Sequence, residues 1–217
     1  MLTPDLKHRI LAAAASEASP TRRQRVVGTA IRAVSALAVP LLLFALVGGA
    51  GLGPRPLGLV AITALGTLAI AAWALLEGFG RGPSMLGRSR GRLLATAALV
   101  PVAFLVWKVI ASSGVPHMMD PWPARPGLRC FGVTVLFAAW PFVALAWERW
   151  GSDPVHPRVL GLALGVGAGG GAAVLVDLWC PVGHVPHLLI GHVAPMLLLG
   201  SLGALVGARV LGVRLGR

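Results

Sequence analysis

Long apolar stretches alternate with short polar connections along this chain. A helix needs roughly 20 apolar residues to cross the hydrocarbon layer of a membrane, and six stretches reach that length. None has the short alternating pattern of a transmembrane β-strand. The sequence therefore predicts an all-α, polytopic membrane protein with a bundle of six transmembrane helices. The expected spans are, to within a few residues, Ala33–Leu52, Leu57–Glu77, Leu93–Ala111, Cys130–Trp147, Val159–Cys180 and Leu188–Ala208.

The composition excludes the main soluble classes. Apolar residues make up 56% of the chain and charged residues only 12%, against roughly a quarter charged in a typical soluble domain. The net charge is +12, which in a soluble chain would suggest nucleic acid as a partner. In a membrane chain it is better explained by topology, because Lys and Arg gather in cytoplasmic loops. With the N-terminus inside, fifteen basic residues fall on the cytoplasmic side and three on the outer side. Both termini are therefore expected in the cytoplasm, and no direct nucleic-acid binding is expected.

The segment before the first span has a different pattern. Residues 1–20 are expected to form a short amphipathic helix, and residues 21–217 the membrane domain. Leu6, Ile10 and Leu11 lie on or beside one apolar stripe of that helix. Thr21 and Gln24 have the spacing of a capping box that would begin the first membrane helix. The stripe either lies on the lipid surface or docks a soluble partner, and the sequence alone does not choose between them.

Glycines recur at four-residue spacing in the fifth predicted span. Gly161, Gly165 and Gly169 share one face of that helix, and Gly203 and Gly207 repeat the pattern in the sixth span. Small residues at this spacing let two membrane helices approach closely. We therefore predict that these glycines pack helix against helix. No motif typical of catalysis occurs, so the chain is not expected to be an enzyme, and no cofactor is predicted.

The chain has two cysteines, and both are predicted at the outer leaflet. Cys130 begins the fourth span and Cys180 ends the fifth. Neighbouring helices lie about 8–10 Å apart, so side chains that face each other could approach within bonding reach. Three interpretations remain open: two inert buried thiols, a structural disulfide, or a pair that senses oxidants or metal ions.

Histidines follow the second cysteine closely. His184, His187 and His192 come after Cys180, and His117 lies in another outer loop. Thiolate and imidazole groups are typical ligands of zinc, copper and haem. These residues are therefore candidate metal or haem ligands, although solvated loop histidines and a packed His192 are the simpler interpretation.

Two charges fall inside predicted spans. Lys108 lies in the third span and Asp177 in the fifth, each about one turn from the outer surface. Because a lone charge in the bilayer is costly, we expect the two to form an intramembrane ion pair if their helices touch.

Several motifs together resemble a known family. Arg125-Pro126-Gly127-Leu128-Arg129-Cys130 opens the fourth span, and Leu178-Trp179-Cys180-Pro181 closes the fifth. Together with Thr3-Pro4-Asp5-Leu6 and six spans in about 200 residues, they resemble the NrsF-type family of integral inner-membrane anti-sigma factors.

The resemblance implies a function. A member would sequester an extracytoplasmic-function sigma factor and release it on an oxidative, metal or related stress. Cys130 and Cys180 would be the sensing pair, and we expect Leu6, Ile10 and Leu11 to dock the sigma factor. The competing interpretation is a metal- or haem-binding membrane protein that uses Cys180 and the nearby histidines as ligands.

Overall fold

The fold is a bundle of long helices, described by a computed structural model. It covers residues 21–48, 55–79, 88–113, 126–150 and 155–212. No strand occurs within these ranges. Six helical segments are long and apolar enough to cross a membrane, which confirms the predicted fold class. In chain order the elements are α2 (Arg22–Leu46), α3 (Leu57–Phe79), α4 (Arg90–Ser112), α5 (Leu128–Glu148), α6 (Pro157–Trp179), α7 (Val185–Leu188), the π-helix η2 (Leu189–Val193) and α8 (Ala194–Val210).

The first membrane helix begins with the predicted capping box. The Gln24 backbone N–H donates to Thr21 Oγ1 at 3.2 Å, and the Thr21 N–H donates to Gln24 Oε1 at 2.8 Å. These two bonds satisfy N–H groups that the first turn of a helix leaves without partners. As a result α2 begins at Arg22, well before the apolar span predicted from Ala33, because its arginine-rich first turns are also helical.

The last membrane segment is not one uniform helix. It passes from α7 through the π-helix η2 into α8. Pro195 lies just after η2, has no N–H and crowds the carbonyl of the residue four positions earlier, Gly191. The Thr134 hydroxyl of α5 donates to the Cys130 carbonyl at 2.7 Å and shares this bond with the Gly191 carbonyl, whose oxygen lies 3.3 Å away. The widened turn rotates the side chains that follow it about the helix axis, relative to the side chains that precede it.

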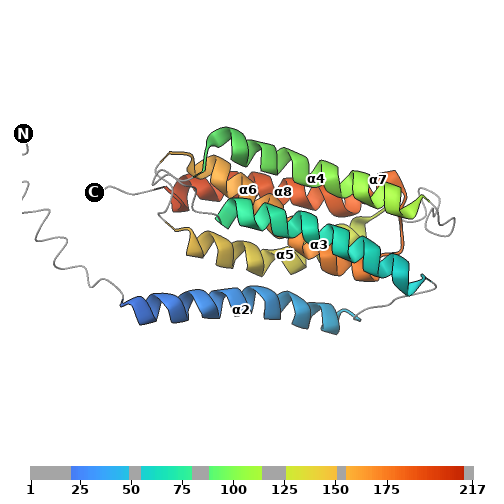
Figure 1. The fold of residues 1–217 in the computed structure, drawn as a ribbon, viewed down its shortest axis with the longest axis horizontal. Coiled ribbons are helices and arrows are strands. Elements are labelled where there is room, and N and C mark those ends of the chain that lie inside the picture. The colour runs from blue at the N-terminus through green and yellow to red at the C-terminus, as the bar shows by residue number, and fades with distance from the viewer. Residues whose placement is uncertain (1–20, 49–54, 80–87, 114–125, 151–154, 213–217) are drawn as a thin grey trace, which may run out of the picture.

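Helix α6 lies at the centre of the bundle. Of its most apolar window, 72% is buried inside the protein, against 6% for α2. It contacts α3, α4, α5 and α8, whereas α2 lies at the edge and packs mainly on α5 (Figure 1). Helix α6 is therefore held by several neighbours at once.

Glycines form the interface between α6 and α8, as predicted. A Cβ added at Gly161 would collide with the Gly203 backbone, and one added at Gly165 would collide with the carbonyl of Leu199. The reverse collision, from Gly203 onto Gly161, also occurs. The two backbones approach so closely that only glycine fits at these positions.

A Gly165→Ala substitution should therefore destabilise the bundle, by about 1–3 kcal/mol for an overpacked core. Gly171→Ala provides the matched control. Gly171 lies on the same helix, and a Cβ added there would meet no atom within 4 Å. Thermal unfolding of the two purified variants in detergent measures the difference. Equal melting temperatures would contradict the close packing of α6 on α8.

The bundle has two distinct ends. The cysteine end holds Cys130 at the start of α5 and Cys180 just after α6. At the opposite end Arg32 forms a salt bridge to Glu148 at 2.6 Å, and Glu77 forms salt bridges to Arg88 and Arg92. Which end faces the cytoplasm stays a prediction.

Candidate functional site

Four buried side chains converge at the cysteine end. Cys130, Cys180, His187 and His192 each offer one ligand atom, and all four atoms lie within 4.8 Å of one another. We call this group the Cys/His cluster. Its members come from the start of α5, the end of α6, α7 and η2. Both cysteines are buried, and no disulfide joins them.

A tight turn brings Cys130 into the cluster. Gly127 caps α5 in the left-handed region, with φ +89°. A Cβ on Gly127 would lie 2.9 Å from both the Gly191 nitrogen and the His187 carbonyl oxygen. Gly191 in turn would place a Cβ 3.0 Å from the Cys130 Cβ. Glycine is needed here because it accepts a positive φ and allows the start of α5 to touch η2.

An arginine fixes the other cysteine. Cys180 follows the last residue of α6, and its carbonyl is among those that the helix end leaves without partners. The Arg55 guanidinium donates to the carbonyls of Asp177, Leu178 and Cys180 at 2.9, 2.9 and 3.2 Å. A cation at a helix C-terminus is also favoured by the helix dipole. Burial lowers the pKa of Arg55 from its ordinary value, while the charges of Asp177 and Cys180 act in the opposite direction.

The two histidines complete the cluster. His187 Nε2 lies 3.2 Å from Cys180 Sγ. The His192 ring stacks on Phe104, with centroids 5.7 Å apart and planes at 25°, and only 1% of the residue is exposed. Within the described part of the chain, neither His192 ring nitrogen has a hydrogen-bond partner. His184 lies outside the cluster, and His117 lies outside the described residues.

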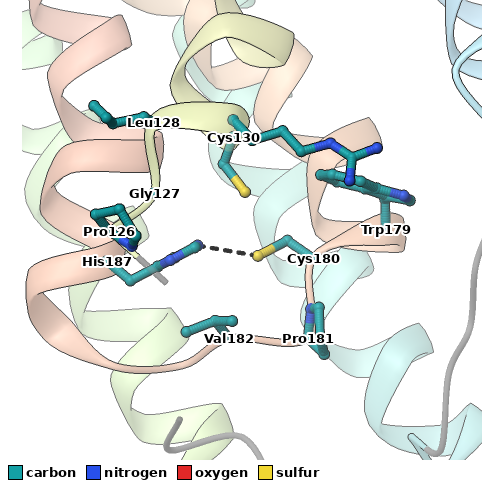
Figure 2. A pocket seen from close by; sticks show the side chains of 10 residues that line it. Pro126, Gly127, Leu128, Cys130, Trp179, Cys180, Pro181, Val182 and His187 are labelled. Atoms are coloured by element: carbon teal, nitrogen blue, oxygen red, sulfur yellow. Dashed lines mark hydrogen bonds between the residues drawn. The ribbon is translucent and has the colours of Figure 1, made fainter. Parts of the chain in front are cut away.

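The cluster forms part of the wall of a cavity of about 500 Å³. Figure 2 shows the Cys130, Cys180 and His187 side chains pointing toward one another. The Arg129 guanidinium lies over the Trp179 ring, 4.5 Å from its centroid. The cavity is lined by Pro126, Gly127, Leu128, Arg129, Cys130, Trp179, Cys180, Pro181, Val182 and His187.

The surroundings favour the deprotonated form of Cys180. Hydrogen bonding with the Cys130 side chain, and then with His187, lowers the pKa of the Cys180 thiol well below its ordinary value, although burial acts in the opposite direction. A thiolate is the reactive form toward oxidants and the form that binds metal ions. The direction of this pKa shift favours reaction with oxidants or metal binding at Cys180.

A buried ion pair lies beside the cluster. Lys108 of α4 forms a salt bridge with Asp177 of α6, and their side chains are 1% and 0% exposed. The Thr67 hydroxyl of α3 donates to the second Asp177 carboxylate oxygen at 3.1 Å. The interaction joins three helices one turn before Cys180, and the carboxylate is occupied by Lys108 and Thr67.

The structure brings together part of the predicted set and adds to it. It unites both cysteines with His187 and His192, and leaves His184 out. The predicted docking residues Leu6, Ile10 and Leu11 lie outside the described residues. Sequence reasoning missed the role of Gly127 and that of Arg55, which it counted only as one of the three basic residues on the outer side. The Pro-Gly pair just before α5 was the available signal for a turn at Gly127.

A family model described as negative regulator of sigma F (NrsF) matches residues 11–212. No curated protein and no solved structure matches the chain. Because the family model covers nearly the whole chain, the protein belongs to the NrsF family of negative regulators of sigma F.

Proposed function

We propose that this chain is a bacterial inner-membrane anti-sigma factor that sequesters an extracytoplasmic-function sigma factor. Membership of a family of negative regulators supports the regulatory role. Six apolar helices support attachment to the bilayer. The role needs binding and release of a protein partner and no chemical turnover, in agreement with the lack of catalytic motifs in the sequence.

The proposed topology places the cysteine end in the periplasm. The charge pattern favours it, because basic residues concentrate in the connections of the opposite end and in the terminal segments. Arg88, Arg92 and Arg149 belong to that opposite end. The sigma factor would then meet a basic surface and the N-terminal stripe of Leu6, Ile10 and Leu11.

The convergence of Cys130 and Cys180 in one buried cluster carries the sensing part of the proposal. The two residues lie on different helices, so any reaction that changes their separation also changes how α5 packs on α6. Both helices continue from the cysteine end to the opposite end. A coupling of about 1–3 kcal/mol between the two ends would change sigma-factor affinity roughly 5- to 150-fold.

Replacing the cysteines tests this function. Cys130→Ser and Cys180→Ser should each reduce stress-induced release of the sigma factor at least about 5-fold, measured with a sigma-dependent reporter and by co-purification from membranes. His184→Gln is the matched control, because His184 lies in the same loop region but outside the cluster. Deletion of residues 1–20 should abolish retention of the sigma factor in unstressed cells. A normal response in both serine variants would show that sensing does not use the thiols.

A further inference from the structure

The donor set of the Cys/His cluster is that of a metal centre. Two thiols and two imidazoles form a common ligand set of tetrahedral zinc sites. In such a site the metal lies about 2.3 Å from sulfur and 2.0–2.1 Å from nitrogen, so that ligand atoms are roughly 3.3–3.8 Å apart. The four donor atoms here already lie within 4.8 Å of one another. A contraction of no more than about 1.5 Å would bring them to those separations.

His192 provides a second, independent observation. It is 1% exposed, and neither of its ring nitrogens has a hydrogen-bond partner among the described residues. A buried polar group without a partner is costly and rare in native proteins. Coordination of one ring nitrogen by an ion would remove part of this cost. Stacking on Phe104 fixes the orientation of the His192 ring before an ion binds.

We propose that Cys130, Cys180, His187 and His192 form a four-ligand site for a divalent, thiophilic d¹⁰ cation of the Zn²⁺ or Cd²⁺ type. The inference rests on the proposed function in one respect only: the proposed topology, with the cysteine end in the periplasm, determines that the ion arrives from the periplasmic side. Two thiolates and two neutral imidazoles carry a charge of −2, so a divalent ion gives a neutral centre, which a buried site favours. Binding releases the remaining thiol protons to water, and no electron is transferred.

The geometry of the four donors favours a bare metal ion over haem. A haem iron receives four nitrogens from its porphyrin and leaves two axial positions for the protein. Four protein donors that converge on one point fill all the positions of a tetrahedral ion and leave none for a porphyrin. They also leave no open position for a reacting water, so the site binds without catalysing.

The elements around the Cys/His cluster give an ion access to the donors, and they would be linked to one another when the ion binds. The cavity of about 500 Å³ is lined by Cys130, Cys180 and His187 and so leads to three of the four donors (Figure 2). Because the donors belong to α5, α6 and the last membrane segment, a bound ion would link all three at the cysteine end. The ion thereby acts as a ligand whose presence fixes the relative position of these helices.

The test is ion binding by the full chain, purified in detergent with both thiols reduced. Zn²⁺ and Cd²⁺ are titrated separately, and Co²⁺ is used as a spectroscopic probe of tetrahedral geometry. We expect one ion per chain, a thiolate-to-metal charge-transfer band with Cd²⁺ and Co²⁺, and the visible bands of tetrahedral Co²⁺. His192→Gln should weaken binding by more than the roughly 10–100-fold that loss of a supporting outer partner causes.

His184→Gln is the matched control and should bind as the unmodified chain does. Thermal unfolding of each variant before metal addition identifies any variant that has not folded, and Cys130→Ser then replaces it. Absence of a bound ion in the reduced chain, or equal affinity in His192→Gln, would overturn the metal site.

The same variants separate this inference from the proposed function. If the serine variants fail to release the sigma factor but the reduced protein binds no ion, the sensing function stands and the metal site is wrong. If His192→Gln abolishes ion binding while both serine variants respond normally, the metal site stands and the thiol-sensing function is wrong.

Discussion

A Lys108→Met variant should lose about 3–5 kcal/mol of stability, the usual result of removing one partner from a buried ion pair. The carboxylate of Asp177, which is 1% exposed, would keep only the hydrogen bond from the Thr67 hydroxyl among the side chains that the structure describes. The carboxylate must then either remain charged in an apolar interior or take up a proton. Unfolding of the purified protein in detergent by heat or by added denaturing detergent measures the loss.

The double variant Lys108→Met/Asp177→Leu is the control for this prediction. Replacing both partners by apolar residues removes the charge together with its counter-charge, and such replacements are often close to neutral. The double variant should therefore be more stable than Lys108→Met alone. If the double variant is as unstable as the single one, then the loss comes from packing and not from an unpaired charge.

Gly127→Ala should disrupt the Cys/His cluster as well as the fold around it. A non-glycine residue in the left-handed region costs roughly 1–2 kcal/mol, and overpacking adds about 1–3 kcal/mol. The new methyl group would press on His187 and Gly191 and move the start of α5, with Cys130, away from η2. We expect a lower melting temperature and a loss of Cd²⁺ binding in the same variant.

Gly132→Ala tests whether this effect is local to the turn. Gly132 lies one turn further along α5, and an added Cβ there meets nothing within 4 Å. Alanine also has the higher helix propensity, so this variant should be as stable as the unmodified chain and bind Cd²⁺ normally. Thermal unfolding and the Cd²⁺ charge-transfer band report both properties. A Gly127→Ala protein that matches Gly132→Ala in both would contradict the close contact described for Gly127.

Much of the fold could be predicted because its causes are local. The six spans follow from apolar length alone, and Thr21 with Gln24 follows from the spacing of a capping box. The glycine face of α6 follows from the four-residue period, because residues at that spacing share a side of any helix.

The site could be predicted only in part, because its remaining causes are tertiary. Counting spans places Cys130 and Cys180 at one depth, but it does not fix the rotation of either helix about its axis. The π-helix η2 changes that rotation for His192, and the sequence signals it only through Pro195. The role of Arg55 depends on carbonyls more than 120 residues further along the chain, which no local pattern shows.

The separation of the cluster residues along the chain has a consequence for biosynthesis. Cys130 enters the membrane with the start of α5, Cys180 follows after α6, and the histidines come only with the last segment. A nascent chain that has inserted α5 and α6 but not the last segment has both thiols and neither imidazole. The cluster can therefore form only after the last segment has been made, and a chain truncated before that segment would expose two thiols without the two imidazoles.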